Sequence, residues 1–376
     1  MTLLKGKYGE AKIFASMIEE EAVEQIKTFL DHQAFEGSSI AVMPDVHSGK
    51  GSVVGFTMTA NEFVIPNIIG VDIGCGVLAY RLGKIEFQFD ELDRFIRRRI
   101  PFGFEVNSSL PDSLPSLFPK KIKKITDKIS LNYEKVLCSI GSLGGGNHYI
   151  EIDQEEESGE YWLVIHSGSR NFGLQTANYH QKKAKEYSFK KNLKLPKDLE
   201  YLPLKEGGEE YLEDMKTAQE LAHLNRMEMA GRIVRDFFNL KEENLEKIES
   251  IHNYINFKDK IIRKGAISAY SGEDLIIPLN MRDGAILGKG KGKESWNFSA
   301  PHGAGRVLSR TKAKKNISLK DYYESMKGVW SSCVSFKTLD ESPFAYKSSD
   351  SIIKNIEDSV EIQKIIKPVY NFKAES

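Results

Sequence analysis

The spacing of apolar and polar positions predicts both helices and strands along the chain. Residues 17–31 (MIEEEAVEQIKTFLD) carry apolar side chains at helical intervals with acids near the start, which predicts a helix. The apolar stretch 38–44 (SSIAVMP) predicts a strand that ends at Pro44. Residues 162–173 (WLVIHSGSRNFG) predict a strand that ends in a polar loop, and residues 209–239 predict a long amphipathic helix.

The remaining segments extend this mixed pattern. Glycine and β-branched residues dominate residues 45–80, which predicts sheet and loops, whereas residues 88–140 are more helical. Short apolar pieces alternate with glycine turns in residues 263–293, and a helical, charged C-terminal part is predicted to follow. Glycine-bearing motifs are scattered from residue 45 to residue 347, without repeats or a low-complexity linker. We therefore expect one interleaved α+β domain over residues 1–376, with a two-domain division as the alternative.

Composition limits the function classes. The 53 basic and 53 acidic residues give a formal net charge of zero, so any nucleic-acid contact must come from local basic patches. The three cysteines, Cys75, Cys138 and Cys333, are far apart and fit no disulfide framework. No window approaches the roughly 18 apolar residues of a membrane span, and the N-terminus lacks a sustained apolar segment. We expect a cytoplasmic protein without membrane contact.

Histidines are concentrated in loop-like sequence contexts. Five of the eight lie in short stretches that contain glycine or asparagine: His47, His148, His166, His252 and His302. An imidazole presented where several loops meet is the commonest transition-metal ligand, although each of these histidines alone is more often a structural residue. The other three occur in helical, charged stretches and are expected to be surface or packing residues: His32, His180 and His223.

The octapeptide GVDIGCGV (70–77) raises the question of a metal site. Asp72 stands three residues before Cys75, which has glycine on both sides. A free cysteine is usually a small buried hydrophobe, but flanking glycines also allow the close backbone approach that a metal site needs. With His148, His166 and His252, these residues supply donors for two metal ions that share the thiolate. CxxC pairs are absent, which disfavours a structural zinc site.

The glycine-rich stretch 141–148 (GSLGGGNH) has two interpretations. It is either a flexible turn, or a loop whose backbone N–H groups and Asn147 amide approach a phosphate chain. It is not a Walker loop, because GxxxxGK[ST] is absent.

The segment 299–315 (SAPHGAGRVLSRTKAKK) also has two interpretations. His302 precedes Arg306 and Arg310, which would follow it by one and two turns if a helix starts there. In the first interpretation the segment is a basic, solvated helix start. In the second, its histidine acts as a nucleophile or as an acid/base group and faces guanidinium groups that hold phosphates.

Together these motifs resemble the RtcB family of RNA ligases, the 3′-phosphate RNA-splicing ligases. The segments that carry the resemblance run in family order from residue 43 to residue 347: MPDVHSGKG, IIGVDIGCG, GGGNHYIEI, IHSGSRNFG, HNY, RKGAISA, HGAGRVLSRTKAKK and FAYK. The resemblance implies a single α+β domain in which mixed β-sheets flanked by helices surround a central cleft with two divalent ions, typically Mn²⁺. The residue chemistry alone supports only a transition-metal pair.

The resemblance also assigns site residues. Asp72, Cys75 and His148 would bind one ion, and Cys75, His166 and His252 the other, so that Cys75 is the bridge. The positions that match contacts to GTP or its guanylate are Asn147, His148, Tyr149, Ile150, Glu151, His252, Asn253, Pro278, Leu279, Asn280, Met281, His302, Gly303, Ala304, Gly305 and Lys347.

The implied chemistry is GTP-dependent joining of RNA. His302 matches the histidine that is guanylylated before GMP passes to an RNA 3′-phosphate, which a 5′-hydroxyl then attacks. A 2′,3′-cyclic phosphate would first be opened. Arg170 and Arg306 are candidate phosphate clamps and the expected catalytic partners of His302, with Arg310 a weaker candidate. The expected substrate is tRNA or damaged RNA, and we expect a monomer that a helper protein can assist.

Two positions and one segment depart from the family pattern. Ile262 stands beside RKGA, where a polar residue is common, IPLNMRDG occupies residues 277–284, and Ala285 replaces a serine. These changes affect the nucleotide loop, whereas the metal ligands and the histidine are retained. The alternative function is a two-metal RNA phosphohydrolase or cyclic phosphodiesterase without guanylylation. A third interpretation is a noncatalytic RNA-binding member of the family.

Overall fold

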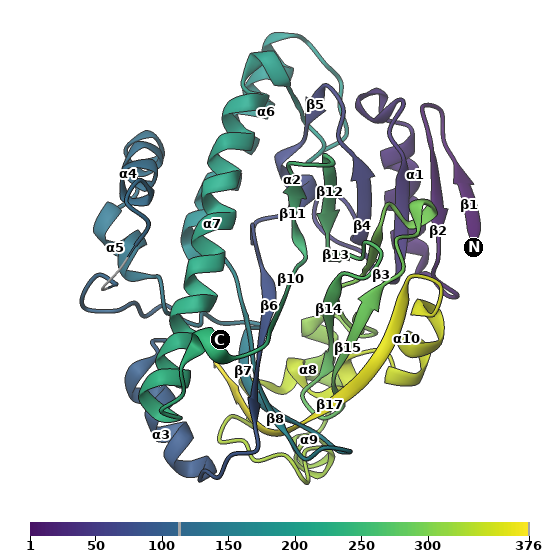
Figure 1. The fold of residues 1–376 in the computed structure, drawn as a ribbon. Helices are drawn as coiled ribbons and strands as arrows, with labels where there is room; N and C mark the ends of the chain where they lie inside the picture. The colour runs from purple at the N-terminus through teal and green to yellow at the C-terminus, as the bar shows by residue number, and fades with distance from the viewer. Residues whose placement is uncertain (112–113, 375–376) are drawn as a thin grey trace.

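Two large β-sheets organise the molecule (Figure 1). The computed structural model describes residues 1–111 and 114–374. The first sheet has six strands in the order β1 (Thr2–Lys5), β2 (Glu10–Ile13), β3 (Ile40–His47), β4 (Val54–Thr59), β12 (Ile261–Lys264) and β11 (Asn253–Asn256). Its β2 and β3 are parallel, and its other neighbouring pairs are antiparallel.

The second sheet has seven antiparallel strands. Their order is β10 (Lys247–Ile251), β6 (Gly76–Gly83), β8 (Tyr161–Ser167), β7 (Tyr149–Glu155), β17 (Val360–Lys373), β15 (Gly284–Gly290) and β14 (Asp274–Asn280). Two small ribbons complete the strands: β13 (Ala266–Ser268) with β16 (Ser299–Pro301), and β5 (Phe63–Val64) with β9 (Leu202–Pro203).

Helices cover the sheets from outside. In Figure 1 the long helices α6 and α7 run side by side, with α4 and α5 beside them. The α-helices are α1 (Glu20–Leu30), α2 (Pro66–Ile69), α3 (Phe89–Arg99), α4 (Phe118–Ile129), α5 (Tyr133–Cys138), α6 (Arg170–Lys190), α7 (Gly208–Arg232), α8 (Arg310–Asn316), α9 (Leu319–Ser325) and α10 (Ser349–Ile356). A π-helical segment, Ile233–Phe237, continues α7.

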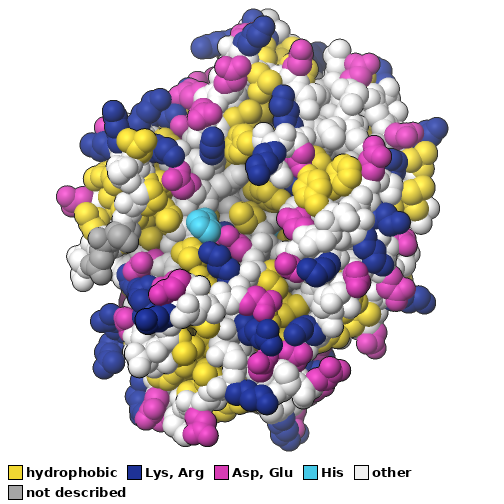
Figure 2. Space-filling model, viewed as in Figure 1, with side chains coloured by type: hydrophobic (Ala, Val, Ile, Leu, Met, Phe, Trp, Pro, Cys, Tyr) yellow, Lys and Arg dark blue, Asp and Glu magenta, His cyan; other side chains and the backbone are white. Residues whose placement is uncertain are grey.

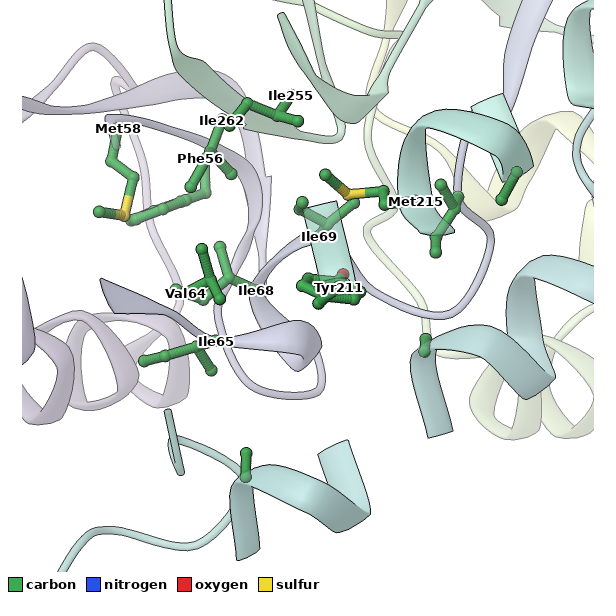
Figure 3. Close-up of a cluster of buried hydrophobic side chains, with 14 of the residues drawn as sticks. Phe56, Met58, Val64, Ile65, Ile68, Ile69, Tyr211, Met215, Ile255 and Ile262 are labelled. Carbon is green, nitrogen blue, oxygen red and sulfur yellow. The ribbon is translucent and has the colours of Figure 1, made fainter. Parts of the chain in front are cut away.

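In the largest hydrophobic core, the short helix α2 packs with residues of β4, β11 and β12 and with α7 (Figure 3). Ile68 and Ile69 of α2 are almost completely buried there, with Met215 of α7 and Ile262 of β12. Burying such side chains stabilises the fold by roughly 1.5–3 kcal/mol each. The core therefore fixes the loop that follows α2, which carries Asp72 and Cys75. It also accounts for Ile262, which fills this core.

The α+β class and most predicted elements are confirmed. Helix α1 lies within 17–31, α7 and its π-helical extension cover most of 209–239, and three helices occupy residues 88–140. His180 is fully buried, with Nε2 2.7 Å from Oδ2 of Asp214, which is the packing role expected of it.

Two element predictions are wrong, and a third is correct only in part. Strand β3 continues through Pro44 to His47. The pairing of β3 with β4 shifts register between Val42 and His47, so the missing N–H of Pro44 breaks no hydrogen bond of the ladder. Helix α6 begins at Arg170 instead of a polar loop, and its buried face includes polar side chains that obscure the helical period. The C-terminal part contains the predicted helices α8, α9 and α10, but the last described element is a strand, β17, which is stabilised by pairing on both edges with β7 and β15.

Charges of both signs are interspersed over the face shown in Figure 2, in keeping with the balanced composition. Within residues 1–111 and 114–374, no helix is both long enough and apolar enough to cross a membrane.

Candidate metal centre and nucleotide cleft

The loop between α2 and β6 brings Asp72 and Cys75 together. The Cys75 N–H donates to the Asp72 carbonyl oxygen at 3.2 Å, and the positive φ of Gly74 (75°) turns the chain between them. The Cys75 thiol is buried. Burial, and next the negative charge of Asp72, raise the pKa of this thiol well above its usual value. A cation is therefore needed to stabilise the thiolate here.

His148 lies between Asp72 and Cys75. Its Nε2 is 3.1 Å from Asp72 Oδ2 and 3.5 Å from Cys75 Sγ. Its Nδ1 lies 2.9 Å from the carbonyl oxygen of Leu143, which accepts a proton and can donate none. That contact assigns the proton to Nδ1, and the lone pair of Nε2 then points at the carboxylate and the sulfur.

His166 and His252 complete the cluster on the other side of Cys75. His166 Nε2 lies 3.2 Å from Cys75 Sγ and 3.3 Å from His252 Nε2, while its Nδ1 faces the carbonyl oxygen of Asn147. Burial is the largest cause that lowers the pKa of both imidazoles well below the usual value. Both side chains are therefore neutral and able to act as ligands.

The cluster fits two metal ions that share one sulfur. The ligand atoms of Asp72, Cys75 and His148 lie within 4.8 Å of one another, as do those of Cys75, His166 and His252. Nitrogen and sulfur lone pairs and a carboxylate converge in a buried space, an arrangement that a transition metal stabilises and that repels without one. The structure thus brings together all five residues expected as ligands.

Helix α7 holds the loops that carry these ligands. The fully buried Arg226 donates from Nη1 to the carbonyl oxygens of Gly74 and Ser167, both at 2.7 Å, and these residues adjoin Cys75 and His166. Its Nε donates to Glu249 at 2.8 Å. Sequence reasoning missed this arginine, because nothing in the local pattern of α7 distinguishes an inward guanidinium from a surface one.

The neighbouring Asn225 fixes the glycine loop of residues 141–148 to the same helix. Its Oδ1 accepts from the N–H groups of Gly141 and Ser142, at 2.8 and 3.0 Å, and its Nδ2 donates to Ser167 Oγ and to the Gly168 carbonyl oxygen. Asn225 and Arg226 together therefore determine where the backbone beside Cys75, His148 and His166 lies.

Close contacts with neighbouring side chains leave room only for glycine at two positions of the site. A Cβ on Gly168 would lie 2.1 Å from Asp72 Oδ1, and a Cβ on Gly144 would lie 1.8 Å from Arg170 Nη1 and 2.7 Å from His148 Nδ1. Gly144 also has a φ of +91°, which L residues rarely adopt. The glycine run is therefore an ordered part of the site.

His302 lies next to the cluster and faces a buried carboxylate. It follows β16, its ring centroid is 4.9 Å from that of His252, and its Nδ1 lies 2.6 Å from Oδ2 of Asp45. Asp45 is completely buried in β3. Sequence reasoning missed Asp45, although a carboxylate inside the apolar run AVMPDV was a signal that it has a partner.

A cavity of about 440 Å³ opens from the metal-ligand cluster past His302. Most residues expected to contact guanylate line it: Asn147, Tyr149, Glu151, His252, Asn253, Pro278, Leu279, Asn280, Met281, His302, Gly303, Ala304 and Gly305. The side chain of Ile150 lies on the other face of β7, buried in a separate hydrophobic core, and so it does not face this cavity. Lys347 donates from Nζ to the Pro44 carbonyl oxygen at 2.9 Å, beside Asp45.

Arg306 and Arg170, expected as phosphate clamps, donate mainly to protein groups. No helix starts at His302, because α8 begins only at Arg310. Arg306 donates from Nη1 to Glu341 and to the Tyr346 hydroxyl, both at 3.2 Å, and it lines the cavity with most of its donors already engaged. Arg170 donates to Ser142 Oγ and to the Gly103 carbonyl oxygen, so it supports loops beside His148.

Buried charged side chains also line this cavity. Despite burial, the charges of Lys373, Arg310 and Arg306 lower the pKa of Glu341 to about 2. Burial raises the pKa of Glu151 to about 7, against the opposing effects of Asn371 and Lys373. Sequence reasoning missed Glu341 and Lys373, which lie outside glycine-bearing motifs.

Comparison with known proteins identifies the family to which the chain belongs. The family model described as "tRNA-splicing ligase RtcB" matches residues 25–374. The chain is 34% identical over 362 residues to the RNA-splicing ligase RtcB of Escherichia coli (strain K12), covering 86% of this chain and 87% of that protein. It is 27% identical over 414 residues to the tRNA-splicing ligase RtcB of Nanoarchaeum equitans, covering 87% and 86%. For the tRNA-splicing ligase RtcB of Methanococcus maripaludis the identity is 26% over 430 residues, covering 91% and 88%. The chain therefore belongs to the RtcB family of RNA-splicing ligases.

Proposed function

We propose that this chain is a GTP- and Mn²⁺-dependent ligase that joins RNA 3′-phosphate or 2′,3′-cyclic phosphate ends to 5′-hydroxyl ends. The observation that carries the proposal is the position of His302. Its ring stands against His252 of the donor cluster and at the wall of the cavity, with Nδ1 held by Asp45. A nucleophile, a metal pair and room for a nucleotide are thereby adjacent.

The two ions are held in the proposal by Asp72, Cys75 and His148, and by Cys75, His166 and His252. When bound, a metal pair supplies positive charge that stabilises phosphate oxygens as negative charge develops on them. The choice of Mn²⁺ rests on the family, because these ligands also suit other transition metals.

His302 performs the first step in this account. With its Nδ1 proton directed to Asp45, the Nε2 lone pair attacks the α-phosphorus of GTP. An N–P bond forms, and the P–O bond to pyrophosphate breaks with its electron pair on the leaving oxygen. The buried carboxylate stabilises the positive charge that the imidazole gains.

Two further exchanges join the RNA. An oxygen of the RNA 3′-phosphate attacks the guanylate phosphorus, and the N–P bond breaks with its electrons returned to Nε2 of His302. The 5′-hydroxyl oxygen of the second strand then attacks the RNA phosphorus, GMP leaves, and the hydroxyl proton is taken up by solvent. A cyclic phosphate would be opened by water before these exchanges.

We also propose the wider setting that follows from the family. One domain spans residues 1–376, acts in the cytoplasm as a monomer, and repairs or splices tRNA or other broken RNA, with a helper protein as an optional partner. The strands β1 and β2, which precede the matched residues, pair into the same six-stranded sheet as β3 and support this extent.

Covalent labelling tests the nucleophile. Incubation with [α-³²P]GTP and MnCl₂ should label the wild-type protein and not His302→Ala, while His223→Ala, a half-exposed histidine on α7, serves as the matched control. Label that persists in His302→Ala would contradict the assignment. Absence of label in the wild type, together with metal-dependent opening of a 2′,3′-cyclic phosphate, would indicate a phosphodiesterase.

A further inference from the structure

A second cavity reaches the metal-ligand cluster from another side. It measures about 610 Å³ and is lined by Asp72, His148 and Arg170 together with residues of α5 and of the loop 103–106. The first cavity shares Val71 and Asp72 with it, whereas His302 lines only the first cavity. Asp72 therefore stands between the proposed guanylate site and this second space.

Phe104 forms an unusual part of the second cavity. Its side chain is completely exposed, although it is a large apolar ring. Its loop is nevertheless anchored: the Gly103 N–H donates to the Gly144 carbonyl oxygen at 2.8 Å, and the Gly103 carbonyl oxygen accepts from Arg170 Nη2 at 2.7 Å. An aromatic ring in water on a fixed loop offers a stacking surface at little further entropic cost.

Positive charge lies at the edges of the same space. Lys135 of α5 is exposed at the cavity and, among the described residues, its ammonium group has no ion-pair partner. A neighbouring hollow shares Gly146 with this cavity and is lined by Thr311, Lys314 and Lys315 of α8. Lys314 is paired with Asp340 at 3.3 Å, whereas Lys135 and Lys315 have no ion-pair partner among the described residues. Apolar walls beside an aromatic ring and these two ammonium groups match a nucleoside followed by its phosphates.

The reaction geometry determines which RNA end fits there. In a phosphoryl exchange the entering and leaving oxygens lie roughly in line on opposite sides of phosphorus. As the O5′–P bond forms and the P–O bond to GMP breaks, GMP leaves toward its own cavity beside His302. The 5′-hydroxyl strand, whose proton passes to solvent, must therefore approach from the side of Asp72 and His148.

We propose that the second cavity seats the 5′-terminal nucleoside of the 5′-hydroxyl RNA strand, with its base stacked on Phe104 and its following phosphate beside Lys135. This inference rests on the proposed ligase function and adds the acceptor site to it. Phe104 and Lys135 belong to none of the glycine- or histidine-bearing motifs.

Separate assays of each step test the inference. Phe104→Ala should be guanylylated by GTP, and should transfer GMP to a 3′-phosphate RNA, at wild-type rates. Its KM for a 5′-hydroxyl acceptor oligonucleotide should rise about tenfold, the size expected for one lost base stack. The guanylated RNA should accumulate. Phe104→Tyr should restore the wild-type KM, and Phe189→Ala, which alters another exposed phenylalanine near the end of α6, should match wild type.

An acceptor whose first nucleotide lacks its base sharpens the test. Its KM should be raised for wild type and raised no further for Phe104→Ala, because the two changes remove the same contact. An unchanged KM in Phe104→Ala, or slower transfer of GMP to the 3′-phosphate strand, would overturn the inference.

Binding without GTP separates the inference from the proposed function. By fluorescence anisotropy, a 5′-hydroxyl oligoribonucleotide should bind Phe104→Ala about tenfold more weakly than Phe104→Tyr or wild type. A wild-type protein that is never guanylylated would contradict the proposed function, while this binding difference would still establish the site. Equal binding by all of these proteins would overturn it.

Discussion

The carboxylate of Asp45 lies 2.6 Å from Nδ1 of His302, across 257 positions of sequence. Asp45 is fully buried in a strand of the six-stranded sheet, whereas His302 follows the short strand β16. The contact fixes the imidazole so that Nε2 is its free nitrogen. The pair therefore connects the fold directly to the proposed guanylylation chemistry.

Replacing Asp45 by Asn should slow guanylylation by about 100-fold, because the neutral amide cannot stabilise the charge that the imidazole gains. Single-turnover labelling with GTP measures the rate. Metal content and thermal unfolding should stay close to wild type, since Asn has nearly the same shape. A variant that is labelled at the wild-type rate would show that Asp45 has no role in the step.

Removal of the shared sulfur should abolish metal binding. Cys75→Ala takes one ligand from both halves of the cluster, so it should lose tight binding of both ions and guanylylation together. Elemental analysis and isothermal titration with Mn²⁺ measure this, and Cys138→Ala is the control. A Cys75→Ala protein that retains two ions and activity would contradict the bridging role.

Arg226 should act as a positioning residue for the metal centre. Arg226→Lys cannot reach both carbonyl oxygens and Glu249 at once, so it should destabilise the fold by about 3 kcal/mol and weaken metal affinity. Denaturant unfolding and metal titration measure the two effects. Arg235→Lys alters a half-exposed ion pair with Glu242 on the same stretch and should change neither. If metal affinity stays at wild type in Arg226→Lys, the arginine serves stability alone.

Glu151 should make stability depend on pH. Its pKa in the folded protein is about 7, above the usual 4.5, so the folded state holds a proton that the unfolded state releases. The stability it contributes is fully present below pH 4.5 and is lost as pH rises through 7. Glu151→Gln should therefore gain stability over wild type between pH 5 and pH 8, by up to about 3 kcal/mol. Denaturant unfolding of metal-free protein at each pH checks this, and parallel curves would contradict it.

Sequence patterns predicted the parts of the site that local chemistry marks. Cysteine, histidine and aspartate in glycine-bearing stretches are a local signal for metal ligands, and the five residues expected as ligands lie together in the structure. Residues that act through distant contacts carry no such mark. Arg226 lies in an ordinary helical pattern, and Phe104 has neither a charge nor a periodic neighbour. Strand β17 was missed for the same reason, because its stability comes from β7 and β15 on its two edges.

Ligation of a defined RNA pair tests the central claim most directly. One strand ends in a 3′-phosphate and the other begins with a 5′-hydroxyl, and the two are incubated together with the protein in the presence and absence of GTP and Mn²⁺. A joined strand should form only when both GTP and Mn²⁺ are present, and none should form with His302→Ala. Joining without GTP, or no joining under any of these conditions, would contradict the central claim.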